Sequence, residues 1–336
     1  MNQIIIHHND LDGRAAAACV AMFAAAPVAG DQIDRQFIEC DYQSVPCPNG
    51  DRWRDADVWI LDYSLPADTL AELLTLTDRV TWIDHHVTAL ADAPNGTPGH
   101  KLRGDRRVGV SACVLTWLYL HKRTAGGRGP EMAGALPLRT VPEALLRINA
   151  WDLAGPGCQA HAHCFAAGLE SLPHGPEALI WRELLGPIGT EAERVRGLEN
   201  LTRDGVAILR SRTARNTDYA RQYAFGTELD GLRAMALNSS AGADAFGDHA
   251  HGAAELEIVF RHTGRVWEVS LYRGPAGVDE LDVSQIAKRY GGGGHAGAAG
   301  FCCAMMPFAP YSTATDLPPT FDYPDEGELT AEPDAD

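Results

Sequence analysis

Short apolar runs alternate with helix-forming stretches through the first half of the chain. Residues 3–6 form a β-branched run, and the apolar runs at 57–62 and 79–84 each end in an aspartate. Helix-forming stretches follow at 14–26, 66–77, 109–123 and 141–150. This alternation predicts an α/β domain with a mostly parallel sheet flanked by helices, whose ligands bind beyond the carboxyl ends of the strands.

The pattern changes after Thr190, which stands three residues before Glu193 in the spacing of a capping box. The charged, amphipathic residues that follow predict a connecting helix. Strands are then expected at 232–238, 254–261 and 265–273, and a helix at 281–290 that ends at Gly291. The predicted organisation is a catalytic domain at 1–188, a connecting helix at 189–222, a smaller α+β domain at 223–306 and an acidic, Pro-rich, disordered tail at 307–336.

Charge and composition narrow the classes of partner. The 336 residues carry a formal net charge of −17, and eight acidic residues with no basic one fall in 307–336, which leaves −9 for the rest. An acidic chain repels long duplex nucleic acid, so no such partner is expected. No apolar run approaches the ~20 residues that span a bilayer, which predicts a cytoplasmic protein with no membrane partner. The eight cysteines include no C-x-x-C pair and are expected to be reduced thiols.

Acids and histidines gather where the predicted strands end. His8, Asp10 and Asp12 follow the first strand, Asp62 follows the next, Asp84-His85-His86 follow the third, and Asp152 follows at a fourth expected strand end. Gly13 is expected to let the chain bend after Asp12. Carboxylates ~4 Å apart repel by roughly 4 kcal/mol at an effective dielectric of 20, so this cluster predicts divalent cations among them. Oxygen ligands with imidazoles favour Mn²⁺, with Mg²⁺ as the alternative.

These segments resemble the motifs of the DHH phosphoesterase superfamily in order and spacing. His8-Asn-Asp10-Leu-Asp12-Gly13 is most similar to the nanoRNase branch, also described as oligoribonuclease or cyclic-nucleotide phosphodiesterase. The run Gly291-Gly-Gly-Gly294-His295-Ala-Gly-Ala-Ala-Gly300 resembles the glycine-rich signature of the DHH-associated domain. Together the motifs cover about residues 3–306.

The resemblance implies two metal ions and a role for each motif residue. Asp10 and His8 would hold one ion, Asp12, His85 and Asp152 the other, and Asp62 would bridge them. His86 would face the scissile phosphate, and Asp84 would either position a histidine or touch a metal. In the second domain, Gly292, Gly293, Gly294 and His295 would bind substrate, with His295 donating to a phosphate oxygen during catalysis. Arg273 is a candidate phosphate clamp by its position.

The sequence therefore predicts a metal-dependent phosphodiesterase that hydrolyses very short oligonucleotides to nucleoside 5′-monophosphates by two-metal activation of water. Alternative substrates are linear or cyclic dinucleotides, cyclic nucleotides and 3′-phosphoadenosine 5′-phosphate, and a nucleotide sensor without activity is the alternative of a different class. The resemblance also suggests a homodimer. Asn238-Ser239 either contact substrate or form a turn, and the sequence leaves both roles open. The Gly/Pro-rich insert at 124–138 is expected to be an idle loop rather than a lid.

Overall fold

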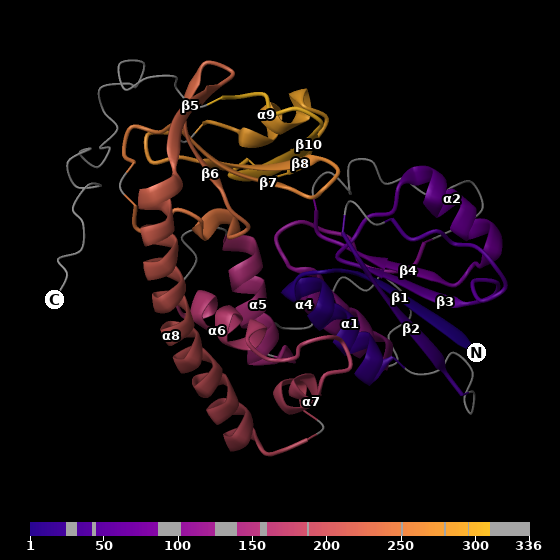
Figure 1. Ribbon diagram of the computed structural model, residues 1–336. Coiled ribbons are helices and arrows are strands. Elements are labelled where there is room, and N and C mark those ends of the chain that lie inside the picture. The colour runs from indigo at the N-terminus through magenta and orange to yellow at the C-terminus, as the bar shows by residue number, and fades with distance from the viewer. Residues whose placement is uncertain are drawn as a thin grey trace. The chain divides into compact units, whose positions relative to one another are not determined.

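The structure is a computed structural model of the chain (Figure 1). It describes residues 1–24, 32–41, 45–86, 102–124, 140–154, 160–186, 188–249, 251–278, 280–294 and 296–309. Residues 125–138 of the insert predicted at 124–138, and residues 310–336 of the tail predicted at 307–336, lie outside these ranges. Among the helices in the described ranges, none is both long and apolar enough to cross a membrane. The chain divides into two compact units, Met1–Ala207 and Ile208–Asp336.

A four-stranded, all-parallel sheet forms the centre of unit 1. Its strands follow the order β2-β1-β3-β4, and their bounds are β1 Asn2–His8, β2 Asp34–Cys40, β3 Asp57–Leu61 and β4 Val80–Ile83. The pairing is parallel throughout, with Ile4 opposite both Gln36 and Val58. All carboxyl ends therefore meet at one edge, and the predicted α/β class is confirmed.

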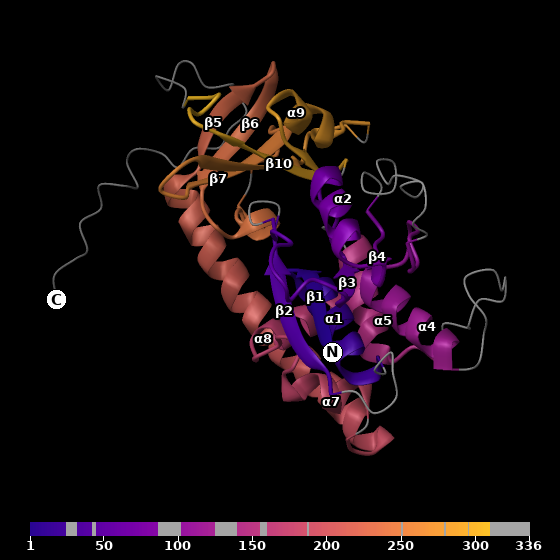
Figure 2. The ribbon, with the colours of Figure 1, turned by 90° about the vertical axis from the view of Figure 1, so that its right-hand side faces the viewer.

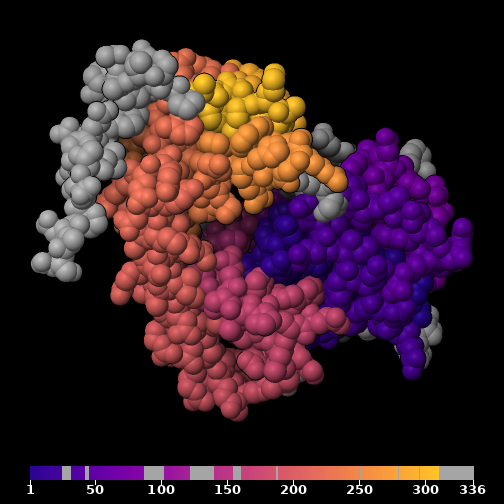
Figure 3. Space-filling model, viewed as in Figure 1, coloured from indigo at the N-terminus to yellow at the C-terminus, as the bar shows by residue number. Residues whose placement is uncertain are grey.

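Helices cover both faces of this sheet because its apolar residues alternate between them. Ile5, Trp59 and Leu61 face one layer of helices, while Ile4, Val58 and Ile60 face the other. The first layer contains α1, α4, α5, α6 and α7, and the second is α2 (Figures 1 and 2). Figure 3 shows α6, α7 and the start of α8 as a continuous outer surface of unit 1. Both faces are thus buried, as a parallel sheet requires.

The helices of unit 1 lie close to their predicted positions, with two exceptions. Their bounds are α1 Leu11–Phe23, α2 Ala67–Leu76, α4 Ala112–Thr124, α5 Glu143–Ala154, α6 Ala160–Glu170 and α7 Leu179–Leu185. Helices α6 and α7 were not expected, since Ala- and Gly-rich sequence at 160–170 has no clear apolar period. Helix α5 extends past residue 150 to Ala154, so Asp152 is a helical residue and its expected place at a strand end is wrong.

Helix α8, Glu191–Tyr223, has 33 residues and contributes to both units. Its predicted capping box is present: the backbone N–H of Thr190 donates to Glu193 at 2.6 Å, and the backbone N–H of Glu193 donates to the Thr190 hydroxyl at 3.3 Å. Gly205 on α8 lies so close to α6 that a Cβ would stand 1.7 Å from the carbonyl oxygen of Cys164. Glycine is therefore required where these two helices meet.

Unit 2 is built on a six-stranded sheet in the order β5-β6-β7-β8-β10-β9. The bounds are β5 Phe225–Leu229, β6 Leu232–Asn238, β7 Leu256–His262, β8 Trp267–Arg273, β9 Gly293–Gly294 and β10 Ala298–Cys303, with helix α9 at Val283–Arg289. Only β6 and β7 are parallel among these neighbours. One face packs against α9, and the other packs against Ala220 of α8 and Phe246. The predicted smaller α+β domain is confirmed.

Candidate metal centre

The predicted site residues of unit 1 converge at the carboxyl edge of the parallel sheet. His8 ends β1, Asp62 directly follows β3, and Asp84 to His86 directly follow β4. Asp10 and Asp12 lie at the start of α1, and Asp152 reaches the same place from α5. This edge is where parallel α/β sheets bind their ligands.

Asp10 joins the first strand to the first helix. It is the N-cap of α1 and accepts a hydrogen bond from the backbone N–H of Gly13 at 2.9 Å. Its other oxygen lies 2.7 Å from Nδ1 of His8. Gly13 is needed for space rather than for a bend, because it has ordinary helical φ and an added Cβ would stand 2.4 Å from the carbonyl oxygen of His8. The expected bend at Gly13 is thus replaced by a close backbone approach.

Asp62 stands at the centre of the cluster in an unusual backbone conformation. Its φ of 55° lies in the left-handed region, where aspartate and asparagine are the non-glycine residues most often found. Its side chain is 1% exposed, its Oδ1 lies 3.1 Å from Nε2 of His85, and its Oδ2 is buried without a hydrogen-bond partner. A buried carboxylate oxygen without a donor suits a cation ligand.

His85 lies among three carboxylates. Besides Asp62, its Nε2 lies 3.4 Å from Oδ2 of Asp152 and 3.7 Å from Oδ2 of Asp12. Oδ2 of Asp152 is also buried without a hydrogen-bond partner. These contacts bring together residues that are far apart in the sequence.

Asp12 is fully buried and links α1 to α4. Its two oxygens accept the backbone N–H groups of Ala112 at 2.6 Å and Cys113 at 2.9 Å. These donors belong to the first turn of α4, where helix N–H groups lack intrahelical acceptors. A carboxylate has about four lone-pair sites, so Asp12 can cap α4 and still offer a lone pair to a cation.

Asp84 positions His86. One oxygen of Asp84 accepts the backbone N–H groups of His85 and His86 and lies 2.8 Å from Nδ1 of the His86 ring. The other accepts the Ser64 hydroxyl at 2.6 Å. This arrangement favours the first of the two roles expected for Asp84, that of positioning a histidine. Ser64 was missed in the sequence because nothing near residue 64 marks a serine that meets a residue of the next strand.

The charges of the cluster oppose one another. Burial and then the charges of Asp10 and Asp12 raise the pKa of Asp62 well above its usual range. Burial and then the charge of Asp12 raise the pKa of Asp152 to about 9. Burial also raises the pKa of Asp10, but the hydrogen bond and charge of His8 outweigh it and lower that pKa to about 2. Without a cation, the cluster therefore retains protons on buried carboxyl groups at neutral pH.

The donor atoms fit divalent cations. Three groups have ligand atoms within 4.8 Å of one another: His8, Asp10 and Asp62; Asp12, His85 and Asp152; and Asp62, His85 and His86. Asp62 belongs to two groups and so does His85, so neighbouring ligand sets share residues. Oxygen and imidazole donors without thiolates suit Mn²⁺ or Mg²⁺.

The predicted substrate residues lie in unit 2. Arg273 donates from Nε and Nη2 to the carbonyl oxygen of Leu281, at 3.3 and 3.0 Å, and its role as a phosphate clamp stays a prediction. Gly292 and Gly294 have a structural requirement of their own, because a Cβ would stand 2.0 Å from the carbonyl oxygen of Gly300 and 2.6 Å from Ala299 respectively. Gly293 pairs with Gly300. His295 lies outside the described residues.

No family model matches the chain, and no curated protein matches it. Similar solved structures include the DHH domain of a member of a ribosomal-protein family, which has 13% identity and a TM-score of 0.46, covering 89% of this chain and 82% of that one. RecJ in complex with Mn²⁺ from Thermus thermophilus has 18% identity and a TM-score of 0.43, covering 91% and 49%. The pGpG-specific phosphodiesterase PggH from Vibrio cholerae has 14% identity and a TM-score of 0.39, covering 90% and 94%. Because these identities and TM-scores are low, function has to be inferred from the residues of this chain.

Proposed function

We propose that this chain is a metal-dependent phosphodiesterase of the DHH superfamily that hydrolyses very short oligonucleotides to nucleoside 5′-monophosphates. The observation that carries the proposal is the convergence of Asp10, Asp12, Asp62, His85 and Asp152 at one sheet edge, with buried oxygens of Asp62 and Asp152 left without donors. A purely structural cluster would be expected to satisfy those oxygens with hydrogen bonds.

The three ligand groups support a division between two ions. His8 and Asp10 would hold one ion, Asp12 and Asp152 with His85 the other, and Asp62 belongs with the first set while lying 3.1 Å from His85 of the second. Bound divalent cations supply Lewis acidity, which lowers the pKa of water and neutralises charge on a phosphate. Mn²⁺ is proposed as the preferred metal on the donor chemistry alone.

His86 is placed to act on the phosphate through a fixed ring. Burial lowers the pKa of His86, but the hydrogen bond and charge of Asp84 outweigh burial, so the net pKa is raised. A protonated ring that holds Nδ1–H against Asp84 keeps a second proton on Nε2. We propose that this Nε2–H donates to a phosphate oxygen or to the leaving oxygen of the substrate.

Substrate length follows from charge and from the resemblance to the nanoRNase branch. A chain with net charge −17 attracts a long polyanion poorly, whereas two to five nucleotides need only a local positive site. Substrate residues in unit 2 and a homodimer remain parts of the proposal that rest on the resemblance.

The test is a length series of end-labelled RNA, from two to twenty-four nucleotides, incubated with the purified chain and Mn²⁺. The account expects fast loss of the shortest RNAs, a steep fall with length and nucleoside 5′-monophosphate as the product. Cyclic dinucleotides and 3′-phosphoadenosine 5′-phosphate belong in the same experiment, because preferred cleavage of either would keep the chemistry and reject the substrate. Binding of nucleotides without turnover of any of them would reject the enzyme and favour a sensor.

A further inference from the structure

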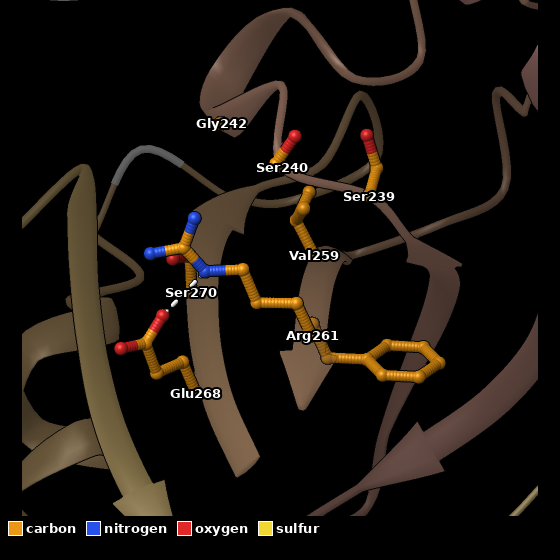
Figure 4. Close-up of a pocket in the computed structure, with 8 residues that line it drawn as sticks. Ser239, Ser240, Gly242, Val259, Arg261, Glu268 and Ser270 are labelled. Carbon is orange, nitrogen blue, oxygen red and sulfur yellow. Dashed lines mark hydrogen bonds and ion pairs between the residues drawn. The ribbon is translucent and has the colours of Figure 1, made fainter. Parts of the chain in front are cut away.

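Unit 2 contains a polar pocket of about 160 Å³ on the sheet face opposite α9. Arg261, Glu268 and Ser270 of the β7–β8 hairpin form one side (Figure 4). Ser239 and Ser240, in the loop after β6, form the other side. The pocket thus combines a cation, an anion and three hydroxyl groups.

Strand register explains why these side chains meet. Arg261 of β7 lies directly opposite Glu268 of β8, and Val259 lies opposite Ser270, so all four share one face. Val259 belongs to the buried cluster on that face and forms an apolar floor. On the next strand, Gly300 lies opposite Ser270 and brings no side chain to the neighbouring position. Because Gly300 has no side chain, it leaves the sheet surface beside Ser270 uncovered.

The charged pair presents both donors and an acceptor. Nε of Arg261 donates to Glu268 at 2.5 Å, and the Arg261 side chain is 56% exposed while that of Glu268 is 15% exposed. Within the described part of the chain, the two terminal amino groups of Arg261 have no hydrogen-bond partner, and neither has the Ser240 hydroxyl. The Ser239 hydroxyl accepts the backbone N–H of Ala241 at 3.1 Å, which makes a tight turn and holds the serine loop in place.

This combination selects a ligand that carries both a negative charge and hydroxyl groups. The free amino groups of Arg261 suit an anionic oxygen, whereas the adjacent carboxylate of Glu268 repels a bare anion and favours a hydroxyl donor. The volume is smaller than the ~300 Å³ at which pockets begin to enclose drug-sized ligands. A sugar phosphate satisfies these conditions, while a planar base would have to remain outside.

We propose that this pocket binds the ribose phosphate part of a ribonucleotide, with the phosphate at Arg261 and a ribose hydroxyl at Glu268. The choice of a ribonucleotide among sugar phosphates rests on the proposed function. The geometry adds a preference that the metal centre alone does not supply, because a carboxylate that accepts from a ribose hydroxyl discriminates against the deoxy sugar. The sequence left two roles for Ser239, a contact with substrate or a turn, and in this proposal Ser239 would have both.

The experiment is a titration of the full-length chain with AMP in the presence of EDTA, followed by amide chemical shifts in ¹⁵N-labelled protein. The account expects AMP and ribose 5-phosphate to shift amides of 239–242, 259–261 and 268–270, and 2′-deoxy-AMP to bind more weakly. Arg261→Ala should weaken AMP binding by about 10- to 100-fold, the range for a hydrogen bond to a charged group. Glu268→Gln should reduce the preference for AMP over 2′-deoxy-AMP. Arg265→Ala, which removes an exposed arginine of the same hairpin outside the pocket, should change neither.

Two results would overturn the proposal. One is the absence of amide shifts at the pocket of the unaltered chain when AMP is saturating, which requires no variant to fold. The other is equal shifts with inorganic phosphate and AMP together with equal affinity for the deoxy sugar, which would leave only an unspecific anion contact. Repeating the titration on Asp62→Asn separates the two proposals. If this variant loses hydrolysis but keeps the AMP-induced shifts at the pocket, the substitution has affected only the metal centre. Hydrolysis without AMP-induced shifts at the pocket would reject only the pocket proposal.

Discussion

Without metal, a protein in which asparagine replaces Asp62 should be at least as stable as the original chain. With metal bound, the variant should be less stable than the original chain. Asparagine is the suitable replacement because it keeps the size of the side chain and tolerates the left-handed backbone at φ 55°. Alanine would mix the loss of the carboxylate with backbone strain at this position. The exchange therefore removes one charge and little else.

The size of the effect follows from the distances in the cluster. Ligand oxygens of Asp10 and Asp62 lie within 4.8 Å of each other, so two ionised carboxylates there would repel by roughly 3.5 kcal/mol at an effective dielectric of 20. Protonation of Asp62 relieves this repulsion wherever the pH lies below its raised pKa, so the stability gained on removing the charge ranges from zero to about this value. Since 1 kcal/mol moves Tm by about 2–4 °C in a domain of this size, the metal-free variant should melt between about 0 and 14 °C higher.

Metal binding should reverse the order. A ligand at 100 times its Kd stabilises the folded state by about 2.7 kcal/mol per site, and the variant should lose most of this gain because Asp62 belongs to two of the three ligand groups. Hydrolysis should fall by roughly 100- to 1,000-fold or more, the scale of losing one preorganised electrostatic group.

Differential scanning calorimetry in EDTA and in Mn²⁺ measures both effects on one sample. Asp78→Asn is the matched control, since Asp78 is an exposed acid in the same unit, just before β4. An Asp62→Asn protein that melts well below the original in EDTA would show that Asp62 is a structural residue. A variant that keeps both the Mn²⁺ stabilisation and the hydrolysis would refute the metal assignment.

Three further predictions concern the same site. Gly13→Ala should destabilise the protein by roughly 1–3 kcal/mol because its Cβ would meet the carbonyl oxygen of His8 at 2.4 Å. Gly197→Ala, in α8 with open space around it, is the control and should stabilise the protein by about 0.5–1 kcal/mol. Chemical unfolding measures both changes, and equal effects would contradict the steric explanation. The folded metal-free protein keeps a proton on Asp152 up to its pKa of about 9, while the unfolded chain loses it near the ordinary aspartate pKa of 3.8, so metal-free stability should fall as pH rises through this window. Mn²⁺ displaces that proton, so its increment in Tm should grow between pH 6 and pH 8, and a constant or shrinking increment would count against proton displacement. Ser64→Ala should lower kcat by roughly tenfold with little change in KM or metal content, because it removes one hydrogen bond to the carboxylate that positions His86; metal loss, seen by elemental analysis, would instead make Ser64 part of the metal site.

The fold was largely predictable where local pattern and tertiary structure agree. The buried strands β1, β3 and β4 are continuous apolar runs, which is how strands covered on both faces read in a sequence. Strands β2 and β5 gave no such signal: β2 carries charged residues along half-exposed positions, and β5 has glycine, threonine and glutamate between its apolar ends. The pairing of β2 with β1 depends on tertiary contacts, whereas β5 pairs with the next strand, β6, across the two residues Asp230 and Gly231.

The residues of the candidate metal centre could be picked out from motif order, but their surroundings could not. Asp152 was expected at a strand end and instead approaches from α5, since an isolated aspartate shows nothing about the element that carries it. The two backbone N–H groups that hold Asp12 come from α4, a hundred residues further along the chain. Contacts of this kind depend on how helices pack, which sequence pattern leaves undetermined.

The most direct test of the central claim is to strip the protein of metal and return Mn²⁺ in measured equivalents while following hydrolysis of a 5′-phosphorylated diadenylate. The account predicts no turnover in EDTA, full turnover when about two equivalents per chain have bound, and AMP as the product. Turnover that persists in EDTA, or that is absent at saturating Mn²⁺ in a protein shown to bind the metal, would contradict it.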